Sequence, residues 1–110
     1  MNTFVIINKV IAGFDRDEGN IQKTQKHGVT VEEIERLFGT RLIILPDMKH
    51  SHLEERFGAV GHNSSGRLML VAFTLRLKEQ KFYIRPISAR FMSWKEGKKY
   101  EQALAEISNR

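Results

Sequence analysis

Cysteine is absent from this 110-residue chain, which excludes a disulfide framework, a thiolate metal cluster and a cysteine nucleophile. Proline occurs only twice and no repeat or composition break divides the sequence, so we expect one domain over residues 1–110. The longest apolar run, residues 68–73, is far shorter than the roughly 20 residues of a membrane span. The start has neither the basic segment nor the cleavage site of a signal peptide. These absences predict a cytoplasmic protein that does not enter a membrane.

Positive charge is in excess: 18 Lys and Arg stand against 13 Asp and Glu, a formal net charge of +5. This balance favours an anionic partner. In the last third of the chain basic residues alternate with aromatic ones, namely Arg85, Arg90, Phe91, Trp94, Lys95, Lys98, Lys99 and Tyr100. Such a mixture is typical of an RNA-binding surface, where bases stack and phosphates pair, but a solvated helix face has a similar composition.

The first half of the chain predicts strands followed by two helices. Residues 4–11 are rich in β-branched side chains and form a strand or two, broken near Asn8. A helix over residues 17–27 ends at Gly28, with Lys23, Lys26 and His27 in its last turn. The next helix begins at a capping box of Thr30 and Glu33.

The second half predicts a sheet and a closing helix. Four apolar runs, residues 42–45, 57–60, 68–73 and 82–87, are bounded by turn residues, and the charged stretch 76–81 connects the last two. Their short separations favour an antiparallel meander. Ser93 and Glu96 form a second capping box before an apolar stripe of helical spacing. The predicted class is α+β, with the helices packed on one face of the sheet.

Metal chemistry has little support in the sequence. The segment from Asp15 to Gly19 superficially resembles a calcium loop, but its glycine is misplaced and Lys26 stands where the bidentate Glu belongs. A single His50-x-His52 pattern in a polar loop is weak as a metal site. We therefore expect no metal and no cofactor.

Acid–base chemistry fits the same region better. His50 can exchange a proton near neutral pH, Glu55 can act as a base, and Arg56 can bind a phosphate through two N–H groups. Cleavage of RNA without a metal needs a base for the 2′-hydroxyl, an acid for the leaving 5′-oxygen and cations for the charge on phosphorus. Further candidate cations are Arg76, Arg90, Lys26 and His27.

A resemblance to a known family covers residues 14–100. The matching motifs occur in order along the chain: Asp17-Glu18-Gly19-Asn20 with Lys23, Lys26-His27-Gly28-Val29, Leu45-Pro46-Asp47, Lys49-His50-Ser51, Glu54-Glu55-Arg56-Phe57, Gly66-Arg67-Leu68, Phe73-Thr74 with Arg76, and Ile87-Ser88-Ala89-Arg90 with Met92-Ser93, Glu96 and Tyr100. This series resembles the BrnT family of bacterial toxins.

The resemblance implies a RelE-like ribonuclease toxin of a type II toxin–antitoxin system that inhibits translation by cutting RNA. It also implies a ribbon-helix-helix antitoxin partner, in a complex with two copies of each protein that represses its own promoter. We expect Arg76, Arg90 and Arg56 to stabilise the phosphate, and His50 and Glu55 to transfer protons. Four further residues are expected to bind RNA: Lys26, His27, Lys95 and Lys98.

Several positions depart from the family pattern. Arg16 stands where a tryptophan is usual, and Trp94 and Gly97 occupy helix positions that are usually basic. Pro86 interrupts a predicted strand, which must therefore be an edge there or contain a bulge. Two other functions stay open at this point: a basic RNA- or DNA-binding module without turnover, and an interaction protein whose basic face serves an acidic partner helix.

Overall fold

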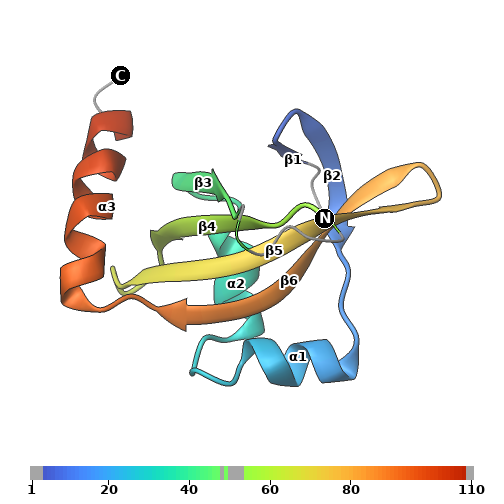
Figure 1. Cartoon of the computed structure of the whole chain (residues 1–110), viewed down its shortest axis with the longest axis horizontal. Helices are drawn as coiled ribbons and strands as arrows, with labels where there is room; N and C mark the ends of the chain where they lie inside the picture. The colour runs from blue at the N-terminus through green and yellow to red at the C-terminus, as the bar shows by residue number, and fades with distance from the viewer. Residues whose placement is uncertain (1–3, 48, 50–53, 109–110) are drawn as a thin grey trace.

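The computed structural model describes residues 4–47, 49 and 54–108. Within these residues, one six-stranded sheet and three helices make up the fold (Figure 1). The elements, in chain order, are β1 (Phe4–Ile6), β2 (Lys9–Phe14), α1 (Glu18–Thr24), α2 (Val31–Leu37), β3 (Leu42–Pro46), β4 (Phe57–His62), β5 (Leu68–Lys78), β6 (Lys81–Phe91) and α3 (Trp94–Ser108). No helix among the described residues is long and apolar enough to cross a membrane.

The sheet has the strand order β1-β2-β6-β5-β4-β3. Its β3-to-β6 part is the predicted antiparallel meander. Strand β2 adds a parallel neighbour to β6, which brings the N-terminal hairpin alongside the last strand. The α+β class is therefore confirmed, and the parallel pairing is an addition that the local pattern did not predict.

The helix starts follow the predicted capping. The Thr30 hydroxyl accepts from the backbone N–H of Glu33, whose carboxylate accepts from the Thr30 N–H. Ser93 and Glu96 make the same pair of bonds at the start of α3. Helix α1 is shorter than expected and ends at Thr24. The basic residue in its last turn is Lys23. The predicted placement of Lys26 and His27 in that turn was wrong, since both follow the helix and are exposed.

Strands β5 and β6 are longer than the apolar runs predicted. The stretch 76–81 is not a connecting loop but the continuation of both strands, joined by a tight turn at Glu79 and Gln80. Both turn residues have positive φ values, 49° and 67°, as in the primed turns of two-residue hairpins. The signal for this extension was the alternation of leucine with charged residues, which is a strand pattern.

Pro86 has the environment predicted for it. The register of β5 against β6 shifts next to it, because Phe73 pairs with Pro86 while the neighbouring Ala72 pairs with Ser88. Pairing of β2 with β6 reaches only Ile84, so Pro86 needs no N–H on that side. The Asn20 side chain of α1 donates to the Pro86 carbonyl at 2.5 Å and ties the helix to this edge.

The two faces of the sheet are covered by different helices. The main core contains Val71 and Phe73 of β5 and, from α2, Ile34 and Leu37; we call this side the α2 face. A smaller cluster joins Leu104 of α3 to Val60, Leu68 and Leu70, whose side chains alternate with those of the α2 face. We call this side the α3 face. The expectation that all helices share one face was wrong, because α3 crosses to the other side at the left end of the sheet in Figure 1.

Arg16 occupies a nearly closed position between β2 and α2. Its side chain is only 9% exposed and its Nε lies 3.4 Å from a carboxylate oxygen of Glu35. The two terminal nitrogens are buried without a hydrogen-bond partner. Burial therefore lowers the pKa of Arg16 from its usual value, against the raising effect of Glu35. The position that is a tryptophan in the family pattern is here filled by the long arginine side chain.

Candidate functional site

A basic hollow opens between α1, the segment before β4 and the α3 face of β5 and β6. Four of its lining residues are cations and one is a carboxylate, and we call it the arginine hollow. Its lining consists of Gly19, Asn20, Lys23, Glu54, Arg56, Arg76, Arg85 and Ile87. A surplus of cations over carboxylates in a concave site attracts anions.

Regular strand geometry places two of these arginines. Arg76 belongs to β5 and Arg85 to β6, where Arg85 is the cross-strand partner of Thr74. Arg76 and Thr74 are two positions apart on one strand, so all three side chains project from the same face. The extension of both strands beyond their apolar runs is what carries Arg76 into the site.

Two hydrogen bonds hold the segment that carries Arg56. The buried Thr74 hydroxyl donates to the Glu55 carbonyl at 2.6 Å. The Asp47 backbone N–H donates to the Arg56 carbonyl at 2.8 Å and joins the end of β3 to the start of β4. Arg56 is thereby fixed beside β5 although it lies outside a regular element.

Carboxylates orient the arginines of the hollow. Arg76 Nη2 lies 3.4 Å from Glu54 Oε1, and Arg85 Nη2 lies 3.0 Å from Asp17 Oδ2. The pKa of Asp17 is lowered first by the hydrogen bond from the Asn20 backbone N–H and then by Arg85. Arg85 Nη1 also lies 3.4 Å from the Asp15 carbonyl oxygen and 3.8 Å from Asp15 Oδ2. A guanidinium has five N–H donors, so the contact of Arg76 with Glu54 leaves other donors for a phosphate, and Arg85 keeps fewer.

The predicted catalytic residues divide into separate groups. Arg56 and Arg76 do line the same hollow. Glu55 is exposed next to it, and its neighbour Glu54 is the carboxylate that lines it. His50 lies outside the described residues, so its predicted role stays a prediction.

Arg90 lies elsewhere on the same face. It pairs with Leu70 and Arg76 pairs with Tyr83, which separates the two arginines along the strands by about 20 Å at ~3.3 Å per residue. Arg90 donates to both carboxylate oxygens of Glu96, at 2.7 and 2.9 Å. This contact, together with the Ser93 N–H, lowers the pKa of Glu96 to about 2, and it raises the pKa of Arg90.

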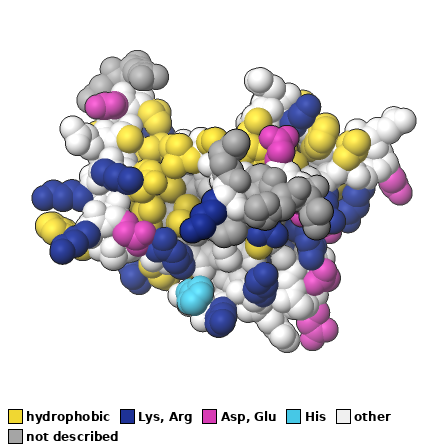
Figure 2. Space-filling model, viewed as in Figure 1, with side chains coloured by type: hydrophobic (Ala, Val, Ile, Leu, Met, Phe, Trp, Pro, Cys, Tyr) yellow, Lys and Arg dark blue, Asp and Glu magenta, His cyan; other side chains and the backbone are white. Residues whose placement is uncertain are grey.

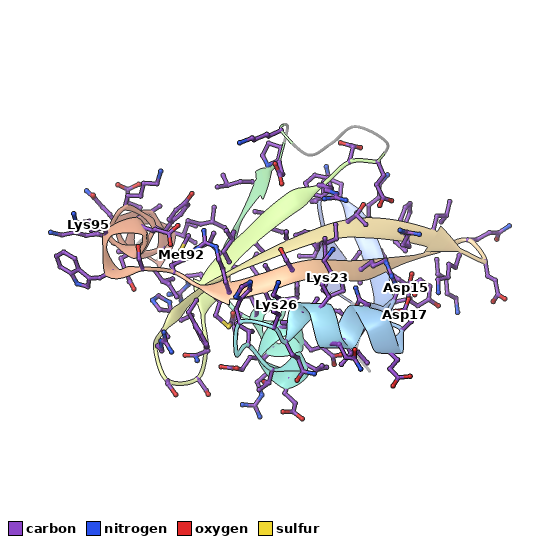
Figure 3. All side chains as sticks on the ribbon, turned by 60° about the horizontal axis from the view of Figure 1, so that its bottom comes forward. Asp15, Asp17, Lys23, Lys26, Met92 and Lys95 are labelled. Atoms are coloured by element: carbon purple, nitrogen blue, oxygen red, sulfur yellow. The ribbon has the colours of Figure 1, made fainter. Side chains whose placement is uncertain are left out.

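The four predicted RNA-binding residues are all exposed. Figure 3 places Lys23 and Lys26 alongside β6, between Asp17 towards one end and Met92 towards the other, where Lys95 begins the exposed side of α3. Lys and Arg side chains also surround the lower end of α3 in Figure 2. Together with the arginine hollow they form a basic path that follows β6.

Two lining cations, Lys23 and Arg85, were not among the predicted site residues. The sequence places Arg85 in the basic and aromatic cluster of the last third, and its alternating position within a strand is a signal that it faces away from the core. Lys23 lies on α1, and its approach to β6 depends on the long-range bond from Asn20 to Pro86. No local pattern predicts that contact.

Possible metal ligands do not cluster in the described part of the chain. Within residues 4–47, 49 and 54–108 no three His, Asp or Glu side chains come together as a possible metal-binding group. The donor set of the arginine hollow is cationic, with Glu54 as its one carboxylate.

A family comparison covers the elements that build this site. The model of the ribonuclease toxin BrnT of type II toxin–antitoxin systems matches residues 16–96, which run from the end of β2 to the first turn of α3. The chain belongs to the BrnT toxin family. No curated protein matches the chain closely.

Membership of the BrnT family gives the site its chemistry. The chain is a ribonuclease toxin of a type II toxin–antitoxin system, and therefore an endoribonuclease with an RNA substrate and a cognate antitoxin. The six-stranded, mostly antiparallel sheet with three helices agrees with the RelE-like fold of such a toxin. The matched region includes every residue of the arginine hollow and the Arg90–Glu96 pair, whereas the β1–β2 hairpin and most of α3 lie outside it.

Proposed function

We propose that this BrnT toxin cleaves RNA without a metal, on the basic path along β6. The observation that supports this is the arginine hollow, where Arg56, Arg76 and Arg85 meet on the α3 face and Glu54 is the one carboxylate among the described lining residues. Preorganised cations of this kind stabilise the charge that develops on a phosphate during cleavage. The reacting phosphate lies in this hollow. Because the RNA substrate is cytoplasmic, the toxin acts in the cytoplasm.

The reaction is an attack by the RNA on its own backbone. A base removes the proton of the 2′-hydroxyl, the 2′-oxygen bonds to phosphorus, and the bond to the 5′-oxygen breaks as an acid protonates that oxygen. The products are a 2′,3′-cyclic phosphate and a 5′-hydroxyl. Candidates for the two proton transfers are His50, Glu55 and, from its place in the hollow, Glu54.

Arg90 takes a second position on the same strand of RNA. Because it is about 20 Å along the sheet from Arg76, the two arginines contact different phosphates. The side chain of Arg90 is 43% exposed, and Glu96 occupies only part of its five donors. Lys26, His27, Lys95 and Lys98 then hold the flanking nucleotides through charge.

We further propose that the antitoxin is a ribbon-helix-helix protein, bound as a complex of two toxins and two antitoxins that represses its own promoter. This rests on the family resemblance, and the basic path supports it, because an acidic antitoxin segment would find its counter-charges there. A toxin silenced in this way loses access to RNA without any change in its fold.

The test is incubation of the purified toxin with a defined RNA in EDTA, followed by analysis of both new ends. We expect cleavage, with 3′ fragments that carry a 5′-hydroxyl and accept phosphate from a kinase without prior dephosphorylation. An RNA with a 2′-deoxy sugar at the cut position is the matched control, and it should stay intact. Cleavage that appears only after a divalent metal is added would contradict the proposal.

A further inference from the structure

Trp94 is the only tryptophan of the chain and its side chain is placed in solvent. It is 76% exposed at the start of α3, the most exposed large apolar side chain among the described residues. No core contact requires a tryptophan there, and the position is usually basic in the family pattern. An exposed indole on a basic surface therefore points to a contact with a ligand.

A groove lies beside Trp94. Leu68 and Met92 give it an apolar lining, and the cations Arg67 and Lys98 and the carboxylate Glu101 line it as well. Gly97 leaves space for the Leu68 side chain, because a Cβ at this position would lie only 3.0 Å from Leu68 Cδ1. The glycine that departs from the family pattern thus allows α3 to pack closely on β5.

Two of the lining cations lie over aromatic rings, one of them in the groove and the other beside it. Lys98 Nζ lies 4.9 Å from the centroid of the Trp94 ring, and Arg67 Cζ lies 3.9 Å from that of Phe91. Lys95 and Lys99 are exposed on the same helix. The basic surface at this end of α3 is visible in Figure 2.

The nearby carboxylates are already engaged. Glu96 is bound by Arg90, and Glu101 Oε1 lies 2.7 Å from His62 Nε2. In the described part of the chain no carboxylate forms an ion pair with Lys95 or Lys98. The groove therefore combines an exposed aromatic ring with the cations Arg67 and Lys98, and its one carboxylate among the described lining residues, Glu101, lies against His62.

We propose that the Trp94 groove is a nucleobase subsite, in which one base of single-stranded RNA stacks on the Trp94 indole while its phosphates contact Lys98 and Arg67. This rests on the proposed function, because it places the base on the strand of RNA that runs from the arginine hollow past Arg90. A nucleotide fits both features of the groove, because its planar base can stack on the indole and its phosphate can contact the cations. An acidic protein helix would satisfy the charge alone.

The single tryptophan makes the test direct, since all tryptophan emission reports on this groove. The probe is an eight-nucleotide RNA with 2′-O-methyl sugars, which cannot be cleaved, and its control is an abasic oligomer of equal length and charge. We expect the RNA to quench Trp94 emission and the abasic oligomer to bind more weakly with little quenching. Equal quenching by both oligomers would overturn the proposal, because charge alone would then explain it.

Variants measure the contribution of the ring. Trp94→Ala should weaken binding of the 2′-O-methyl RNA by about tenfold, as expected for one lost base stack, and Trp94→Phe should recover part of it. Leu77→Ala is the matched control: Leu77 is 63% exposed at the far end of the sheet and its loss should leave binding unchanged. Unchanged affinity in Trp94→Ala, or quenching by the antitoxin but not by RNA, would overturn the subsite.

The outcomes also separate this proposal from metal-free cleavage. Base-dependent quenching by a toxin that fails to cut RNA in EDTA would support the subsite and contradict the cleavage mechanism. Normal cleavage in EDTA with unchanged RNA binding by Trp94→Ala would support the mechanism and overturn the subsite.

Discussion

Arg90 and Glu96 form a two-point ion pair that joins the end of β6 to the first turn of α3. Arg90 Nη1 and Nη2 donate to the two carboxylate oxygens at 2.7 and 2.9 Å, and the same carboxylate accepts the Ser93 backbone N–H at 2.9 Å. One carboxylate thereby caps the helix and orients an arginine that faces the proposed RNA path. The geometry makes Glu96 a positioning residue for Arg90.

Replacing Arg90 by alanine should lower RNA cleavage at least about tenfold, because a charge contact to the substrate is lost. The fold should persist, since the side chain is 43% exposed and contributes little to the core. The measurement is the single-turnover rate, with circular dichroism as the check on folding. A rate equal to that of the unmodified toxin would remove Arg90 from the site.

The stability contributed by Glu96 should depend on pH. Its pKa falls from 4.5 to about 2 in the folded chain, so the contribution is fully present above pH 4.5 and is lost as the pH falls towards 2. Glu96→Gln keeps a capping group but removes the charge. We expect it to lower the Tm by a few degrees at pH 7, and the difference should shrink at pH 3. A difference of the same size at both pH values would contradict the assignment.

Antitoxin binding and RNA cleavage should exclude each other. Both are proposed to use the basic face that carries Arg76, Arg90, Lys95 and Lys98, and opposite charges should make the association rate fall as salt rises. The measurement is cleavage at increasing antitoxin concentration. If the fully formed complex still cuts RNA at the rate of the free toxin, the shared-face model is wrong.

Much of the fold follows from short-range signals. Both capping boxes act over three residues, and the apolar runs of β3 to β6 lie between turn residues, so the helix starts and the meander are predictable. Pro86 is predictable for the same reason, because a missing N–H restricts any strand that contains it. These features depend on the chemistry of neighbouring residues alone.

Other features depend on contacts between distant segments. The parallel pairing of β2 with β6, and the packing of α3 on the face opposite α2, join residues far apart in the chain. The tight turn at Glu79 and Gln80 carries no glycine or asparagine, the usual signal for positive φ, so the sequence of the charged stretch predicts a connecting loop instead of a hairpin.

The candidate site shows the same division. Arg56 and Arg76 were found because of their charge and their place in the family pattern, and they do lie in one hollow. Lys23 joins them because α1 docks on the edge of β6 through Asn20, whereas Arg85 is placed by its pairing with Thr74 across β5 and β6. The sequence alone also does not show that Arg76 and Arg90 lie at different places on the sheet, because the distance between them is set by the register of two long strands.

The most direct test of the account compares two cations on the same strand. Arg76 lines the arginine hollow, whereas Lys78, two positions further along the same face, lies 3.0 Å from Asp15 and is not among the lining residues. We predict that Arg76→Ala slows RNA cleavage in EDTA by about tenfold or more, while Lys78→Ala, which removes the same charge, leaves the rate within about twofold. Equal rates for the two variants would contradict the claim that RNA is cut in the arginine hollow.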